Sequence, residues 1–156
     1  MKKVMFISST GGHLSELLQL KPLFNEYDYR LVTEKTKSNL ALKNEYGKRV
    51  SFLTYGNKHN LLKYIFVFPL NFFRSLGKFI AFRPNVIVTT GAHTCVSMCY
   101  IAKLFRRKVI YIETFANIHS KTLTGRLVYP IADVFVVQWE SMLELYPKAV
   151  YGGWIF

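Results

Sequence analysis

The chain has 156 residues, of which 51% are hydrophobic and 19% are charged, so it is long enough for one domain with its own core and too apolar to be disordered. Its formal net charge is +12. No Asp or Glu lies between Glu45 and Glu113, whereas Lys and Arg recur throughout that stretch, which favours a polyanion or an anionic membrane surface as partner. A soluble protein of high pI is the alternative interpretation.

Strands and helices are expected to alternate along the chain. Short runs rich in Val, Ile and Phe predict strands at 3–8, 29–33, 50–54, 85–89, 109–113 and 134–137. Longer patterns predict helices at 13–25, with a kink near Pro22, and at 36–46, 60–82, 93–105, 120–132 and 139–146. Apolar strands that alternate with helices are typical of a parallel sheet covered on both faces. We therefore predict one Rossmann-like, doubly wound α/β domain over residues 1–156. If its first five strands lie in the order 3-2-1-4-5, the first and fourth strands are neighbours.

Two loops at one edge of this sheet carry residues suited to binding an anion. Gly11, Gly12 and His13 lie between the first strand and the first helix, where glycines let backbone N–H groups approach a phosphate. The loop after the fourth strand has similar features, and ligands of such sheets bind where the strand order reverses. Each loop alone could be a simple capped turn, but together they predict an anion-binding site made of Gly11, Gly12, His13, Thr90, Gly91, His93 and Thr94.

Several other kinds of site are disfavoured. The chain lacks both the Gly-x-Gly-x-x-Gly pattern and the Walker Gly-Lys-Ser/Thr, which argues against a nicotinamide or flavin cofactor and against ATP hydrolysis. Cys95 and Cys99 have no Cys or His cluster nearby, so we predict core packing and no metal site. The first residues do not form a signal-peptide pattern, and we expect a cytoplasmic protein.

The segment 61–82 is apolar around most of its circumference. Its longest charge-free run, Tyr64 to Phe73, is about half of the ~20 residues that a membrane-spanning helix needs, so we do not expect it to span. Basic residues cluster on one side of the helix and aromatic residues fill much of the rest, a pattern typical of helices at the membrane surface. A protein partner or the domain core are the alternatives. The predicted membrane-contacting residues are Lys63, Phe66, Phe68, Phe72, Phe73, Arg74 and Lys78.

Glu113 ends the buried-looking strand 109–113 and should emerge at the same sheet edge as the two loops. There it could act as a general base, or accept hydrogen bonds from a hydroxyl or a backbone amide.

In combination, several motifs resemble the membrane-associated, acceptor-side subunit of split glycosyltransferases. Such subunits occur in the two-part N-acetylglucosaminyltransferase of asparagine-linked glycosylation and in bacterial capsule or exopolysaccharide clusters. A more distant resemblance is to the N-terminal half of the peptidoglycan N-acetylglucosaminyltransferase, which has the GT-B fold. The motifs are Gly11-Gly12-His13-Leu14, Pro84 to Ile87 leading to Thr90-Gly91, Tyr111 to Ala116, Leu123 to Asp133, and Val137-Gln138-Trp139.

The resemblance implies half of a GT-B enzyme. The partner would be a second polypeptide that binds a UDP-sugar, galactose or N-acetylglucosamine, with galactose favoured. This chain would present an undecaprenyl-diphosphate-linked saccharide at the cytoplasmic face of a bacterial plasma membrane, for capsular or exopolysaccharide synthesis. His13 and Glu113 are the candidate catalytic residues, with no cofactor. The expected interface with the partner is Gly152, Gly153, Trp154, Ile155 and Phe156.

The chain also differs in two places from the families that it resembles. Ala92-His93-Thr94 replaces a more glycine-rich turn, and we expect no separate N-terminal membrane anchor, unlike in the eukaryotic subunits. Two other functions stay open: a self-sufficient enzyme or binding module for a phosphorylated small molecule, and a nucleic-acid-binding module suggested by charge alone. The second lacks any recognised nucleic-acid-binding motif.

Overall fold

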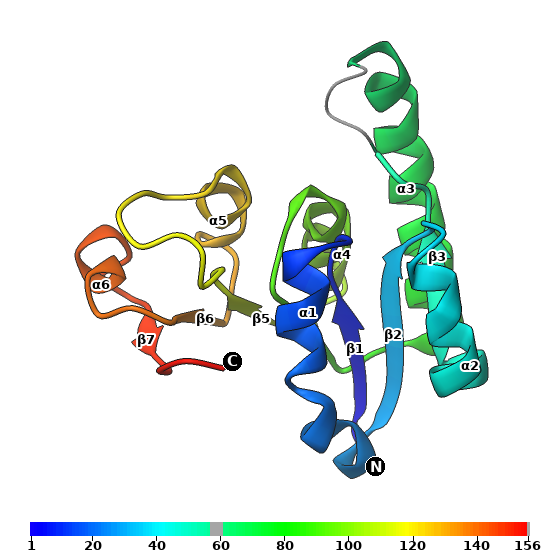
Figure 1. Cartoon of the computed structure of the whole chain (residues 1–156), viewed down its shortest axis with the longest axis horizontal. Helices are drawn as coiled ribbons and strands as arrows, with labels where there is room; N and C mark the ends of the chain where they lie inside the picture. Colours follow the sequence, from blue (N-terminus) through cyan, green and yellow to red (C-terminus); the bar gives the residue numbers. More distant parts are fainter. Residues whose placement is uncertain (57–60, 156) are drawn as a thin grey trace.

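The computed structural model describes residues 1–56 and 61–155, with side chains described outside 57–64 and 156. Within these residues the chain forms one parallel sheet of order β3-β2-β1-β4-β5-β6-β7 (Figure 1). The predicted fold class is confirmed, and the observed order places β1 and β4 side by side. The strands are β1 Lys3–Ile7, β2 Asp28–Glu34, β3 Val50–Leu53, β4 Val86–Thr89, β5 Lys108–Ile112, β6 Val134–Val137 and β7 Val150–Tyr151.

Helices cover both faces of the sheet, as β1 illustrates. Its residues Met5 and Ile7 belong to one core cluster, and Val4 and Phe6 belong to the other, because successive strand residues point to opposite faces. The first cluster includes α3 (Leu61–Phe82), α4 (His93–Leu104), α5 (Leu123–Val128) and α6 (Met142–Leu145). The second includes α1 (Gly12–Leu18), the 3-10 helix Lys21–Glu26 and α2 (Leu42–Tyr46); further 3-10 turns lie at Asn39–Ala41 and Gly47–Arg49.

The structure differs from the predicted elements mainly at helix ends. The helix expected at 13–25 is two pieces, because Pro22 has no N–H and lies in the first turn of a separate 3-10 helix. The helix expected at 120–132 begins at Leu123, where the Thr122 side chain accepts a hydrogen bond from the Gly125 N–H. Strand β7 was not predicted; at two residues it is too short to show an alternating pattern.

Helix α3 is long and unevenly buried. In Figure 1 it extends past the carboxyl ends of the strands at its N-terminal end. Phe79 and Phe82 pack into the core. The Asn71 side-chain amide donates to the Thr54 carbonyl at 2.8 Å and accepts from the Thr54 N–H at 2.9 Å. Six large apolar side chains of the helix are exposed: Ile65, Phe66, Phe68, Leu70, Phe73 and Ile80. Of these, Phe66, Phe73 and Ile80 lie on the side of the helix opposite to Asn71.

Two expectations about α3 need correction. Phe72 is half-buried against the core and the edge of the Phe73 ring, so it does not face outward. The expectation that this segment could not span a membrane was too strict, since Ile65–Phe82 is long and apolar enough by length and composition. The contacts of Phe79, Phe82 and Asn71 nevertheless attach this helix to the sheet. Lys63 lies outside the described side chains.

Candidate functional site

The loops after β1 and β4 lie side by side at the carboxyl edge of the sheet, as the sequence predicts. The Ser9 N–H donates to the Gly91 carbonyl at 3.1 Å. His13 and Thr90 are joined twice: His13 Nδ1 lies 2.8 Å from the Thr90 carbonyl oxygen, and the Thr90 hydroxyl donates to the His13 carbonyl at 2.6 Å. The two loops therefore form one unit.

The geometry fixes which nitrogen of His13 is available. A carbonyl oxygen can only accept, so Nδ1 carries the proton in its bond to Thr90. In the neutral ring Nε2 then has a lone pair, and the side chain is only half-buried. A histidine oriented through Nδ1 with Nε2 available has the arrangement of a general base.

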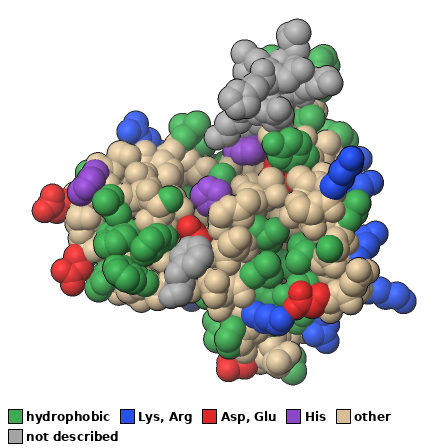
Figure 2. Space-filling view, in the orientation of Figure 1, with side chains coloured by type: hydrophobic (Ala, Val, Ile, Leu, Met, Phe, Trp, Pro, Cys, Tyr) green, Lys and Arg blue, Asp and Glu red, His purple; other side chains and the backbone are tan. Residues whose placement is uncertain are grey.

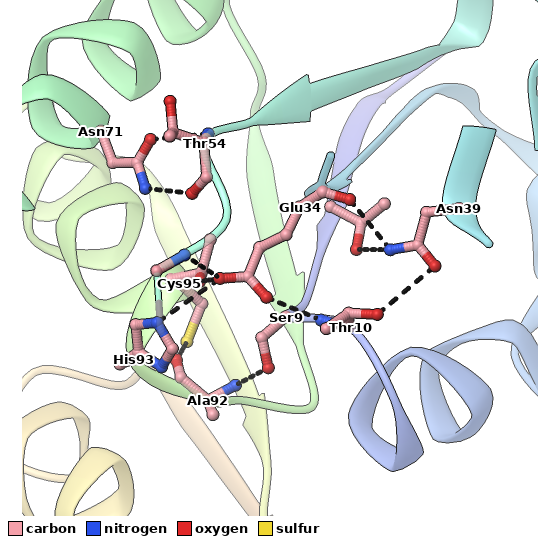
Figure 3. Close-up of polar contacts among 12 residues, drawn as sticks. Ser9, Thr10, Glu34, Asn39, Thr54, Asn71, Ala92, His93 and Cys95 are labelled. Carbon is pink, nitrogen blue, oxygen red and sulfur yellow. Dashed lines mark hydrogen bonds and ion pairs between the residues drawn. The ribbon is translucent and has the colours of Figure 1, made fainter. Parts of the chain in front are cut away.

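Glu34, at the end of β2, is the buried centre of this edge (Figure 3). Its carboxylate accepts hydrogen bonds from the Thr10 N–H at 3.1 Å, the Thr94 hydroxyl at 2.7 Å and the Gly56 N–H at 3.5 Å. His93 Nε2 lies 3.4 Å from the same carboxylate. One side chain thus joins the segments that follow β1, β3 and β4 to the end of β2.

Burial alone would raise the pKa of Glu34, but the hydrogen bonds from His93, Thr10 and Thr94 outweigh it and lower the pKa below the ordinary value. The ionised carboxylate is therefore the form that the site stabilises. The sequence analysis assigned Glu34 no role. Its position at the carboxyl end of a buried strand was the available signal.

Several predicted ligand residues turn out to position others. Thr94 is buried and its hydroxyl is bound to Glu34, and Thr90 is fully buried and bound to His13. Gly91 has a φ of +93°, and a Cβ there would lie 3.4 Å from His13 Nδ1. Gly91 thus permits close packing of the loop on His13. Gly11 and Gly12 are exposed, with open space around both, and are the glycines accessible to a ligand.

Two further buried carboxylates order the other side of the edge. Glu16 of α1 accepts hydrogen bonds from the Thr114 hydroxyl at 2.7 Å and the Phe115 N–H at 3.2 Å, and burial raises its pKa. This residue had no role in the sequence analysis, where it was hidden in a leucine-rich helix. It connects the glycine–histidine loop to the segment after β5.

Glu113 is enclosed, which argues against the predicted role of general base. Its carboxylate accepts from Tyr146 at 3.0 Å, from Thr122 at 2.9 Å and from the Thr114 N–H at 3.0 Å, and the residue is 1% exposed. Burial and the nearby Glu113 charge raise the pKa of Tyr146, which keeps that hydroxyl protonated as a donor. The alternative interpretation, an acceptor of structural hydrogen bonds, describes Glu113 better.

The C-terminal residues pack partly on their own domain. Trp154 contacts the rings of Phe115 and Trp139, with centroids 5.4 and 5.1 Å away, and stays 60% exposed. The Ile155 N–H donates to Gln138 at 3.1 Å. The predicted packing of Cys95 and Cys99 is confirmed, since both are buried and free, and no metal-binding cluster of His, Cys, Asp and Glu occurs among the described residues.

The family model described as "Oligosaccharide biosynthesis protein Alg14 like" matches residues 56–155. The chain belongs to the Alg14-like family. Among curated relatives, the "UDP-N-acetylglucosamine transferase subunit ALG14" of Yarrowia lipolytica is 40% identical over 46% of this chain and 36% of its own length. The mouse protein of the same name is 25% identical over 97% of this chain and 82% of its own length. The chain spans less than half the length of the fungal relatives it matches.

This Alg14-like chain also resembles solved structures at the level of fold. It superposes on MurG of Acinetobacter baumannii with a TM-score of 0.73 and 16% identity, covering 90% of this chain and 43% of MurG. A UDP-bound MnaA of S. aureus gives a TM-score of 0.73 and 12% identity, covering 97% of this chain and 43% of MnaA. At these identities the likeness establishes the Rossmann-type fold of a MurG-like domain.

Glu34→Gln should destabilise the Alg14-like fold by about 3 kcal/mol at pH 7, because an amide cannot accept from all the donors around it. The folded pKa of Glu34 lies below its ordinary value of 4.5, so its stabilisation is present above that pH and is lost as pH falls through the folded pKa. In urea unfolding, the difference in free energy of unfolding between wild type and variant should decrease below about pH 4.5. Glu140→Gln, at an exposed position, is the matched control. A difference in free energy of unfolding that stays unchanged down to pH 3 would contradict an ionised Glu34 in the folded state.

Gly125→Ala should destabilise the protein by about 3 kcal/mol, since a Cβ there would collide with Glu113 Oε2 and the Tyr146 hydroxyl. Gly77→Ala is the matched control, because a Cβ at that helix position meets open space. It should raise the free energy of unfolding by up to about 1 kcal/mol through helix propensity. Equal effects of the two substitutions in thermal unfolding would refute the enclosed Glu113 cluster.

Proposed function

We propose that this chain is the membrane-associated, acceptor-side subunit of a two-part glycosyltransferase. The observation that carries the proposal is membership of the Alg14-like family, whose curated relatives are named as subunits of a UDP-N-acetylglucosamine transferase. The fold supports it, since the chain forms one Rossmann-type domain that corresponds to less than half of MurG. A second polypeptide would then bind the sugar nucleotide.

For the chemistry, we assign His13 as the residue that meets the acceptor. Its Nε2 would take the proton of the acceptor hydroxyl or donate to the diphosphate, while the accessible backbone of Gly11 and Gly12 would lie against the phosphates. Thr90, Gly91, His93 and Thr94 would keep this loop in place. An inverting transfer forms the new glycosidic bond as the bond from the anomeric carbon to UDP breaks, and the hydroxyl proton leaves through the base.

We assign membrane contact to the exposed side of α3. Phe66 and Phe73 are 76% and 67% exposed, and Arg74 lies beside them at the surface. The N-terminal end of α3 extends beyond the same sheet edge that carries His13 (Figure 1), so a lipid-linked acceptor could reach the loop from the bilayer. Figure 2 shows histidine side chains at the surface on this side of the molecule.

We assign the exposed aromatic surface of Trp154, with Tyr151 and Val150 of the edge strand β7, to the donor-binding partner. Gly152, Gly153 and Ile155 join that surface to β6 and Gln138; Phe156 lies outside the described residues. Apolar aromatic side chains at a chain surface are typical of protein interfaces.

The donor we propose first is UDP-N-acetylglucosamine, as the names of the relatives indicate, and UDP-galactose is the second candidate. The acceptor we propose is a polyprenyl-diphosphate-linked saccharide at the cytoplasmic side of a membrane. The undecaprenyl form, in bacterial capsule or exopolysaccharide synthesis, is the more specific proposal. Assays with both donors, and with undecaprenyl and dolichyl acceptors, distinguish these cases.

The chain alone should transfer no sugar, whereas the complex captured with its donor-binding partner should be active. In that complex, His13→Ala should lower kcat by about 10²–10⁴-fold, the usual contribution of a general base. His119→Ala, at an exposed position, is the matched control and should leave kcat unchanged. Full turnover by the isolated chain would favour a self-sufficient enzyme, and unchanged turnover of His13→Ala would remove the assigned role.

Replacing Phe66 and Phe73 by Ser should abolish flotation of the chain with anionic liposomes, because both large apolar side chains would leave the membrane interface. Phe105→Ser, on α4's C-terminal side and 47% exposed, tests whether any exposed aromatic residue has the same effect. Flotation that survives the α3 double substitution would contradict membrane contact through this helix.

A further inference from the structure

A cationic pocket lies away from the sheet edge, between the C-terminal half of α3 and strands β1 to β3. The cavity has a volume of about 250 Å³. Met5 and Arg30 are paired neighbours on β1 and β2, and Ser51 of β3 pairs with Val32, which places these side chains on the face that α3 covers. The lining residues used below are Met5, Arg30, Lys48, Ser51, Lys78 and Phe82.

Three cations from three separate elements line this pocket, and no acid does. The nearest carboxylate paired with one of them is Asp28, 3.7 Å from Arg30, in an exposed pair that contributes little. Arg30 lies over the ring of Phe82 at 4.9 Å, which fixes the plane of its guanidinium. Burial, and then the nearby Arg74 charge, lower the pKa of Lys78. The pocket therefore concentrates positive charge that its own side chains leave largely unneutralised.

The donors match one ligand chemistry. A guanidinium fork, two ammonium groups and the Ser51 hydroxyl all donate hydrogen bonds, and together they suit a tetrahedral anion with more than one charge. The apolar floor of Met5 and Phe82 would accommodate the carbon atoms attached to that anion.

The position of the pocket around the axis of α3 can be compared with that of the exposed apolar side of the helix. Phe66, Phe73 and Ile80 are seven residues apart and form one exposed apolar stripe. At about 100° per residue, Lys78 lies about 140° around the helix from the middle of that stripe, between the exposed side and the sheet and nearer to the sheet. Were the stripe in the acyl region of a bilayer, the lysine would reach headgroup phosphates. Figure 2 shows Lys and Arg side chains gathered along the margin formed by α2, β3 and α3.

We propose that this pocket binds a phosphate group, carried either by an anionic lipid headgroup or by a free phosphorylated molecule. The site is separate from the loop of His13 and does not depend on the transferase function proposed above. In the lipid case it makes attachment to the membrane selective for anionic phosphate, beyond the general attraction of a basic surface.

The test compares Lys48→Gln/Lys78→Gln with Lys37→Gln/Arg107→Gln, which removes the same charge away from the pocket. Binding to phosphatidylcholine vesicles with and without phosphatidylglycerol is measured by sedimentation, at equal thermal stability of the variants. Because each basic residue contributes about fivefold at such a surface, the pocket variant should lose about 25-fold in affinity for the phosphatidylglycerol vesicles, and the control much less. Exposed Lys48→Gln alone, which leaves the packing intact, should lose about fivefold.

A second arm titrates the chain with inorganic phosphate and follows the amide resonances of Arg30 and Ser51. If the pocket variant loses vesicle affinity and phosphate shifts these resonances, the pocket accepts either source. Lost vesicle affinity without the shifts identifies the lipid headgroup. Shifts without lost vesicle affinity identify a free phosphate. Equal vesicle loss in the two double variants, or unchanged binding in both arms, would overturn the pocket. Binding to neutral vesicles, which would depend on Phe66 and Phe73, is a separate measurement, and its result does not change the interpretation of these outcomes.

Discussion

The buried carboxylate of Glu34 decides the shape of the edge on which the rest of the site depends. Hydrogen bonds reach it from the segments that follow β1, β3 and β4, while Glu34 itself ends β2. Removing a carboxylate from water is costly, so this arrangement persists only while its donors are all in place. The ends of four neighbouring strands are therefore coupled through one ionised group.

Two other buried carboxylates connect further segments across the sheet in the same way, by accepting hydrogen bonds. Glu16 connects α1 to the segment after β5, and Glu113 connects that segment to Thr122 and Tyr146. Beside this framework, Gly11 and Gly12 are exposed, and the ring of His13, oriented by Thr90, is half-buried. Under the function proposed above, this one domain would carry both the acceptor loop and the membrane-contacting helix α3, while a second chain would bind the sugar nucleotide.

Much of the fold was predictable because it depends on local pattern. Buried parallel strands are continuous apolar runs, and the glycine–histidine loop after β1 is visible at a single position in the sequence. The predicted site was right about which loops meet, since strand order alone determines it. The roles of Thr90 and Thr94, and the choice between the two roles predicted for Glu113, could not be decided from the sequence, because accessibility depends on side chains that arrive from distant segments. Tyr146, thirty-three residues beyond Glu113, is an example. A charge-free run is a stricter criterion than the length and composition of the whole helix, by which Ile65–Phe82 is long and apolar enough to span.

We predict that this domain binds the acceptor and not the donor. The direct measurement is an amide chemical-shift titration of the isolated chain with two compounds: a short-chain prenyl-diphosphate N-acetylglucosamine and UDP-N-acetylglucosamine. The first should shift Gly11, Gly12 and His13, and the second should shift none of them. Binding of the sugar nucleotide at these residues, with no response to the prenyl diphosphate, would contradict the account.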